Sequence, residues 1–245
     1  MGRPDFRRQL DILIDRNLAI QWGSRGTAAM IVAQAPVIGY FIGVAWKGQE
    51  AAPQTYFVMA VAALWMGCMN ACTAVVQERA VYERERMFEL DIRAYLLSKI
   101  AVLAVIAAAQ TLLLLAVQGH FMRLAGGLLP PALGFLTLAA ANLSAAGLGL
   151  LVSCFARTPY GAVVTVPLLL IPQVLFSRII LQQNVESGVP AAIEKLTITK
   201  WAYEALTDLH DGASWGVQLK CLLALLAGLV AFLSASYLKL RSDDN

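Results

Sequence analysis

Charged residues are scarce in this sequence, at 14% of 245 residues, whereas 59% of the residues are hydrophobic. A soluble domain has about 25% charged residues, and the mean hydropathy here is +0.65. This composition excludes an ordinary soluble domain and predicts an all-α polytopic membrane protein. The formal net charge is only +3, and the bases do not cluster on an aromatic-rich surface. We therefore expect no nucleic-acid partner.

Motifs of nucleotide and hydrolytic sites are missing. The chain contains no G-x-x-x-x-G-K-[ST], no H-E-x-x-H and no G-x-S-x-G, so it has no phosphate-binding loop of its own. We predict that it is not an enzyme and holds neither cofactor nor metal ion. Its two histidines, His120 and His210, fall in predicted outer loops, which favours solvated side chains over ligands. Cys68 and Cys72 share a helical face that could hold a soft metal, but small core residues are favoured because no further ligand is near.

No ionisable residue lies deep within the long apolar stretches. Six of these meet the requirement of about 20 apolar residues for a membrane span: Ala28–Trp46, Tyr56–Val76, Tyr95–Val117, Pro131–Phe155, Pro159–Leu181 and Val217–Leu238. Proton-coupled pumps and ion channels usually need ionisable groups at that depth. The pattern argues against a self-powered transporter and suits a path for an apolar or amphipathic substrate, driven from outside the membrane.

The connections between these stretches carry local signals. A tight turn, Ala156–Thr158, separates the fourth and fifth spans, and the prolines at 167 and 172 predict a kinked or broken fifth helix. The longest non-spanning stretch is Gln182–Gly216. Within it we predict a helix over Thr199–Leu209, with Thr199 as N-cap and Gly212 just past its end. Nearby aromatic residues suit an external segment that hugs the membrane or re-enters it.

Residues 5–22 form an amphipathic pattern that predicts an interfacial helix. Contact with a cytoplasmic partner is favoured over a simple anchoring role. With the N-terminus inside, thirteen Lys and Arg fall on the inner side and six on the outer side, namely Lys47, Arg123, Arg178, Lys195, Lys200 and Lys220. The excess of inner bases places both termini in the cytoplasm.

The stretch Gln77–Lys99 holds ten of the thirty-five charged residues. Its acids and bases pair at helical spacing, Arg79 with Glu83, Glu83 with Arg86 and Glu89 with Arg93, each pair contributing about 0.2–0.5 kcal/mol. The spacing predicts a short polar helix at the cytoplasmic surface between the second and third spans.

This stretch resembles a known family. The run Glu78-Arg79-x-x-Tyr82-x-Arg84-Glu85-Arg86, followed by Tyr95 and Lys99, is similar to the end of the second span and the coupling helix of G-subfamily ABC exporters. The runs PQVLFS at 172–177 and WAYEAL at 201–206 resemble the fifth span and the outer re-entrant segment of that family. The amphipathic helix is similar to its connecting helix. The resemblance covers essentially the whole chain and rests on order and spacing. Three departures are a coupling stretch about one residue shorter before Tyr95, Arg178 where relatives tend to have a small residue such as Gly, and the lack of the nucleotide-binding domain that is fused in many relatives.

The resemblance implies one transmembrane domain over residues 1–245, with a connecting helix at 5–22 and a six-span permease core at 28–238. It implies an ABC ATPase on a separate chain, which would supply ATP and Mg²⁺. A six-span copy is half of such an exporter, so a second copy or a homologous permease is expected as partner, within membrane lipids. A permease split from its ATPase is more usual in bacteria and favours a bacterial inner membrane.

The resemblance also implies roles for single residues. Arg84, Glu85 and Arg86 would dock into the ATPase, beside Tyr82 of the same motif, and Glu78 and Arg79 would join the amphipathic helix to the second span. The alternative is that these charges form a solvated loop face.

Four further residues would line a substrate pathway at a dimer interface between the second and fifth spans, namely Met66, Asn70, Gln173 and Phe176. Ordinary helix packing explains each of them equally well. Small residues of the fourth span, among them Ala145 and Gly149, favour close helix packing.

The function expected from these patterns is the transmembrane subunit of an ATP-driven exporter that moves a hydrophobic or amphipathic molecule by alternating access. The alternative is a non-transporting membrane scaffold that recruits a soluble partner through the same charged helix. An intramembrane enzyme has little support, because the sequence provides no catalytic set.

Overall fold

The computed structural model describes residues 6–23, 25–47, 52–121, 129–181 and 189–243, and within these ranges the chain is helical without any strand. The elements in chain order are α1 (Phe6–Gly23), α2 (Arg25–Ala45), α3 (Pro53–Ala71), the 3-10 helix η1 (Val76–Glu78), α4 (Arg79–Arg86), α5 (Ile92–Phe121), α6 (Leu129–Phe155), α7 (Pro159–Leu175), α8 (Arg178–Leu181), α9 (Val189–Leu196), α10 (Ile198–Asp211) and α11 (Trp215–Asp243). The prediction of an all-α protein is confirmed for this part of the chain.

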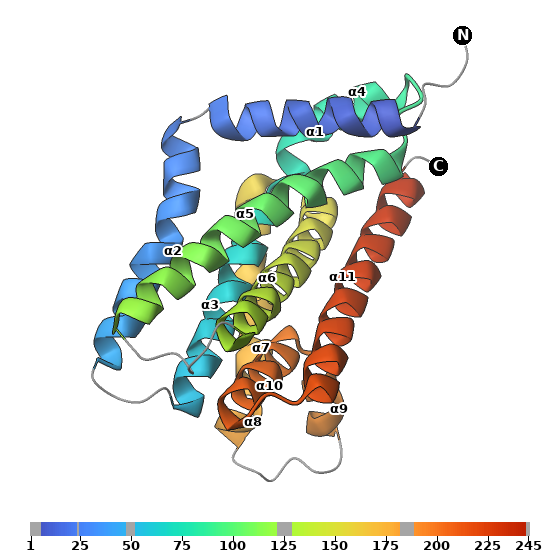
Figure 1. Cartoon of the computed structure of the whole chain (residues 1–245). Helices are drawn as coiled ribbons and strands as arrows, with labels where there is room; N and C mark the ends of the chain where they lie inside the picture. The colour runs from blue at the N-terminus through green and yellow to red at the C-terminus, as the bar shows by residue number, and fades with distance from the viewer. Residues whose placement is uncertain (1–5, 24, 48–51, 122–128, 182–188, 244–245) are drawn as a thin grey trace.

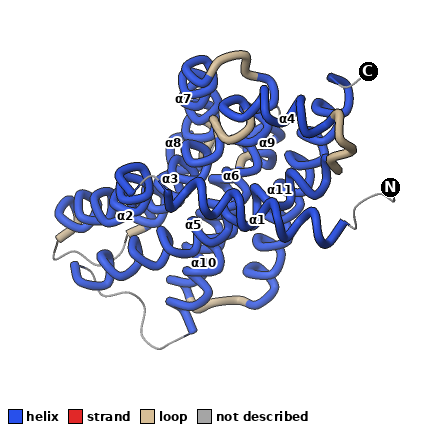
Figure 2. Tube along the Cα trace, turned by 90° about the horizontal axis from the view of Figure 1, so that it is seen from above, coloured by secondary structure: helices blue, strands red, loops and turns tan. Residues whose placement is uncertain are grey.

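Long helices form a bundle whose two ends differ (Figure 1). At one end α1 lies across the bundle and packs on α5, with α4 beside it, and the end of α11 lies here too. Figure 2, seen from above, shows α1 crossing the bundle next to α5. The short helices α8, α9 and α10 lie at the opposite end (Figure 1).

Five segments of the described chain are long and apolar enough to cross a membrane: Ala28–Ala45, Pro53–Arg86, Ile92–Phe121, Pro130–Phe155 and Trp215–Asp243. The second of them runs from α3 through η1 to α4. The helix α7 is apolar but has 17 residues, fewer than the usual 20 or so. Helix length therefore supports five of the six expected spans and does not establish the fifth, which corresponds to α7.

The helix α7 begins and ends at local signals. Thr158 caps its start by accepting a hydrogen bond from the Gly161 backbone N–H at 3.1 Å, and a proline follows at the first helical position, as is favoured there. The helix continues through Pro167 and Pro172 and then breaks at Phe176–Ser177 before α8. The expected break is confirmed, but it lies after the second proline. The Arg178 side chain and residues 182–188, both part of the sequence predictions, lie outside the described structure.

The core is centred on α3 and α6, which approach each other closely. A Cβ added to Gly67 of α3 would lie 2.0 Å from the backbone oxygen of Asn142, and one added to Gly149 would lie 2.4 Å from the backbone oxygen of Cys68. Ala145, between these two positions of α6, is fully buried. The predicted small-residue packing of the fourth span is confirmed, because only residues without a larger side chain allow this contact.

Two local predictions were wrong in detail. The stretch Gln77–Lys99 is not one helix: α4 ends at Arg86, and a turn in which Glu89 has a positive φ of 64° precedes α5. Glu89 and Arg93 therefore do not share a helix. At the other end of the chain, Thr197 rather than Thr199 caps α10 by accepting from the Lys200 N–H, whereas Gly212 follows the helix as expected.

Candidate functional site

The charged helix α4 sits on an aromatic and aliphatic cluster. Tyr82 points inward from α4 and packs against Tyr95 of α5, with ring centroids 4.9 Å apart. Both rings are buried, together with Leu13 of α1 and Leu90 of the turn after α4. The cluster explains why α4 has a fixed position although it has only eight residues, since an isolated helix of this length is unstable in water.

An ion pair joins α4 to α1. The Arg16 guanidinium donates to the Glu85 carboxylate, 69 positions away in sequence, and each side chain is about 30% exposed. Glu85 was expected to dock onto a partner, and the structure places it in contact with α1 of its own chain. The sequence pattern did not single out Arg16 for this contact.

A second ionic contact lies deeper, at the base of α4. The Lys99 ammonium of α5 donates to the Glu78 carboxylate and, at 2.9 Å, to the Asn17 side-chain oxygen of α1. Asn17 in turn donates to the Ser98 hydroxyl at 3.0 Å, and Lys99 is only 7% exposed. Glu78 thus contacts α1 through Lys99 and Asn17. Asn17 was missed, although it lies one helical turn after Leu13 on the apolar face of α1.

Arg79 holds the start of α4 to other helices. It donates to the backbone oxygens of Cys154 at 3.0 Å and Ala156 at 3.2 Å, and its guanidinium lies 3.5 Å from the Asp243 carboxylate. The carbonyl groups at a helix C-terminus lack helical partners and attract cations. Arg79 therefore caps α6 and contacts α11, whereas the expectation was a contact with α1.

The outer face of α4 and the turn that follows are exposed. Glu83 and Arg84 point away from the bundle, and Met87 and Phe88 are each 80% exposed. Two adjacent large apolar side chains in such a setting are typical of a contact surface. The charge pattern of this stretch did not indicate this pair.

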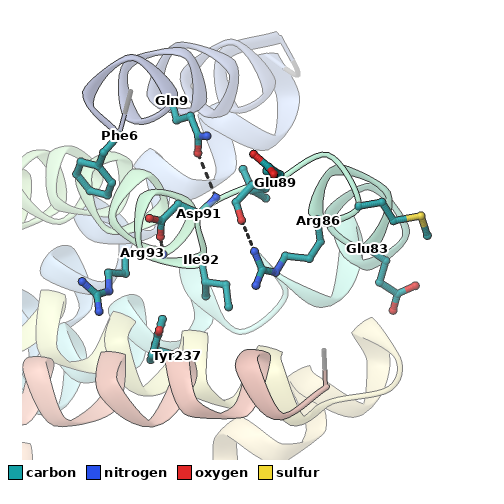
Figure 3. Close-up of a pocket in the computed structure, with 11 residues that line it drawn as sticks. Phe6, Gln9, Glu83, Arg86, Glu89, Asp91, Ile92, Arg93 and Tyr237 are labelled. Atoms are coloured by element: carbon teal, nitrogen blue, oxygen red, sulfur yellow. Dashed lines mark hydrogen bonds between the residues drawn. The ribbon is translucent and has the colours of Figure 1, made fainter. Parts of the chain in front are cut away.

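Hydrogen bonds close the turn behind Met87 and Phe88. Arg86 donates to the Leu90 backbone oxygen, and the Asp91 backbone N–H donates to the Gln9 side chain of α1 at 3.1 Å (Figure 3). A cavity of about 840 Å³ lies beside the turn and extends to Arg93 and Tyr237. The apolar tip is therefore presented on a turn that its own chain holds in place.

The four substrate-pathway candidates lie in different surroundings. Met66 is fully buried in the core. Asn70 accepts from Gln34 of α2 and donates to Gln110 of α5, both at 2.9 Å. Gln173 accepts from the Ile198 backbone N–H at 3.0 Å and so ties α7 to α10, while Phe176 is half-buried at the break after α7.

The other polar candidates also have structural contacts. Cys68 and Cys72 are buried in the α3 core, and the Tyr56 hydroxyl lies 3.4 Å from the His210 ring. Within the described ranges no three His, Cys, Asp or Glu gather closely enough to hold a metal ion. The arrangement provides mechanical links between helices. Glu85 connects α4 to α1, Glu78 connects its start to α5 and α1, and Arg79 connects it to α6 and α11.

Comparison with known proteins identifies the family of this chain. The chain matches the family described as ABC-2 type transporter over residues 8–209, from α1 into α10. No curated protein matches the chain. The family match extends over most of the sequence and includes α4, α5 and α6, whereas α11 lies beyond the matched residues. The chain therefore belongs to the ABC-2 type transporter family, as a membrane permease subunit of an ABC transporter.

Proposed function

We propose that the chain is the transmembrane subunit of an ATP-driven exporter that moves a hydrophobic or amphipathic molecule by alternating access. The observation that carries the proposal is the exposed turn after α4, where Met87 and Phe88 face outward, on a helix that Glu85, Glu78 and Arg79 hold in place. Such a helix is suited to receive movement from a soluble motor. The motor shifts the two access states only by its differential affinity for them.

The proposed topology has six spans, with α7 as the short fifth span. The thirteen inner and six outer bases support a cytoplasmic N-terminus. In this arrangement α1 is the interfacial connecting helix and α4 is the cytoplasmic coupling helix. The segment α8–α10 is then external, and α10 is its re-entrant part.

The proposed partner at α4 is a separate ABC ATPase, which binds ATP and Mg²⁺. Arg84 is exposed and available to it, whereas Glu85 and Arg86 already have contacts inside the chain. We assign the main contact to Met87 and Phe88, because buried aromatic anchors contribute most of the energy in protein interfaces. Arg84 and Glu83 then form the polar rim.

The proposed active unit is a dimer, with a second copy or a homologous permease and two ATPase subunits. The apolar side chains of α7 that stay exposed, among them Val164, Leu168 and Ile171, support a seam along this helix. Phe176 lies half-buried at its external end and is the better pathway candidate. Met66, Asn70 and Gln173 would serve the pathway only if helices move, since all three already pack within one protomer.

Co-purification tests the proposal. The chain is isolated from its host in mild detergent, and the ATPase that accompanies it is assayed for ATP turnover in lipid vesicles, with and without the chain. An exporter subunit changes that turnover, and Phe88→Ala removes the change. A scaffold, the alternative function, brings down no ATPase or leaves its turnover unaffected.

A further inference from the structure

Lys200 is a buried lysine in the first turn of α10, one of the short helices at the end of the bundle opposite α1 (Figure 1). It is only 8% exposed, and lysine is almost never buried to this extent unless an anion pairs with it. Within the described part of the chain, its ammonium makes neither an ion pair nor a hydrogen bond. The ammonium nitrogen lies 4.3 Å from the centroid of the Trp201 ring. Such a contact offsets only part of the cost of burying a charge.

The place of Lys200 in its helix adds to this cost. The helix α10 has 14 residues and begins at Ile198, so Lys200 lies where the helix dipole carries partial positive charge. Anions are favourable at such a helix start and cations are not. Glu194 of the preceding helix α9 is buried as well, but the two residues form no ion pair. The surroundings of Lys200 therefore favour the binding of a negative charge.

A second lysine meets the same indole ring. The ammonium nitrogen of Lys220, near the start of α11, lies 5.2 Å from the Trp201 ring centroid. Lys220 also pairs with the Glu204 carboxylate at 3.2 Å, and its side chain is more than half exposed. Two ammonium groups beside one ring are thus accompanied by a single paired carboxylate. One positive charge around Trp201 is left without a counter-charge, on the buried lysine.

These features define the ligand. An anion can approach beside Lys220, because this side chain is open to the surroundings. Lysine ammonium groups bind phosphate through charge and through hydrogen bonds to its oxygens. Trp favours the layer of a membrane in which the headgroups lie, and a further exposed tryptophan, Trp215, begins α11. A phosphate at the membrane surface therefore fits both the charge and the aromatic setting.

We propose that Lys200 and Lys220 together bind one phosphate group beside the Trp201 ring, and that the ligand as a whole is anionic. A ligand that also carries an ammonium or choline group would bring a charge of the same sign as the lysines. An anionic phospholipid and free inorganic phosphate both offer the required chemistry, and the experiment distinguishes them. This inference goes beyond the transport function and does not depend on it.

The test measures binding by native mass spectrometry on the purified, delipidated full chain in detergent, without nucleotide or ATPase. Phosphatidylglycerol, phosphatidylcholine and inorganic phosphate are added separately. We expect phosphatidylglycerol to bind more tightly than phosphatidylcholine. In Lys200→Met its affinity should fall by about tenfold, the change expected for loss of a hydrogen bond between charged groups. Binding of inorganic phosphate with the same dependence on Lys200 would identify free phosphate as the ligand.

A matched variant and a second measurement make the result specific. Lys47→Met removes an exposed lysine after α2 and should leave binding unchanged. Without ligand, Lys200→Met should unfold in detergent at the same temperature as the unmutated chain or at a higher one, since it removes a buried charge without an anionic partner. The bound ligand should raise the unfolding temperature of the unmutated chain but not that of Lys200→Met.

Three results would overturn the proposal. The first is that neither phosphatidylglycerol nor inorganic phosphate binds Lys200→Met more weakly than Lys47→Met. The second is that phosphatidylcholine binds as tightly as the preferred ligand. The third is that Lys200→Met lowers the unfolding temperature of the ligand-free chain, which would mean that the Trp201 contact alone stabilises the ammonium. None of these results bears on the contact between α4 and an ATPase.

Discussion

Arg16 and Glu85 join the amphipathic helix α1 to the charged helix α4 across 69 positions of sequence. The pair is partly exposed, and such pairs contribute only about 0.2–1 kcal/mol to stability. Its main consequence is geometric, because it links α4 to α1.

Reversing one charge of this pair should uncouple the subunit. We expect Glu85→Arg to fold, with a small change in stability, and to reduce the stimulation of the partner ATPase several-fold, as like charges now push α4 away from α1. The double variant Arg16→Glu/Glu85→Arg restores the ion pair and should restore stimulation. ATP turnover in vesicles measures this. If the double variant stays inactive, Glu85 acts on the ATPase directly and not through α1.

Truncation of the exposed tip should weaken docking of the ATPase. Phe88→Ala removes a side chain that is 80% exposed, so the fold should be unaffected. Loss of a central aromatic anchor costs about 2 kcal/mol or more in an interface, or roughly 30-fold in affinity. Titration of the ATPase onto the immobilised chain measures the change. Trp215→Ala removes an exposed aromatic at the start of α11, far from α4 in the chain, and is the matched control that should bind normally.

Gly67 should tolerate no side chain. In Gly67→Ala the new Cβ would overlap the Asn142 backbone oxygen, at 2.0 Å, and overpacking of this kind costs about 1–3 kcal/mol. Gly134→Ala is the control, because its Cβ would meet nothing nearer than 3.8 Å. We expect a lower midpoint of thermal unfolding in detergent for the first variant and an unchanged or higher midpoint for the second. Equal midpoints would contradict the close contact of α3 with α6.

Breaking the contact between Lys99 and Glu78 should be more damaging than replacing both residues. Lys99→Met leaves a carboxylate that is about one-fifth exposed without its partner, and a broken buried pair costs about 3–5 kcal/mol. Lys99→Met/Glu78→Gln removes both charges and should recover most of the loss. Denaturant unfolding of the three proteins gives the comparison. A double variant as unstable as the single one would mean that Glu78 contributes little to the effect.

The proposed orientation can be tested by labelling, because the four natural cysteines are buried. Glu83→Cys places a thiol on α4, and Asp211→Cys places one at the end of α10. In intact cells a membrane-impermeant maleimide should label the second variant only, and both after the cells are opened. Labelling of Glu83→Cys in intact cells would invert the topology and remove the basis for a cytoplasmic ATPase at α4.

Local sequence patterns explain which parts of the site could be predicted. The charges of residues 77–99 predicted a polar helix, and Tyr82 belongs to the run 78–86 that resembles the coupling helix, because both features depend on neighbouring residues. The end of that helix at Arg86 was not foreseen. It depends on Glu89 adopting a positive φ and on the Gln9 contact with Asp91, and no spacing rule contains either.

The sequence by itself determined that the chain is a helical membrane protein, where its apolar runs lie, and that a charged segment interrupts them, since composition and periodicity act over a few turns of helix. The tertiary structure alone decided that Arg16 meets Glu85, that Lys99 meets Asn17, and that Gly67 meets Asn142. These partners are 69 to 82 positions apart, and the chain's own pattern cannot name them. They are chosen by the way whole helix faces pack together, which also leaves Met87 and Phe88 facing outward.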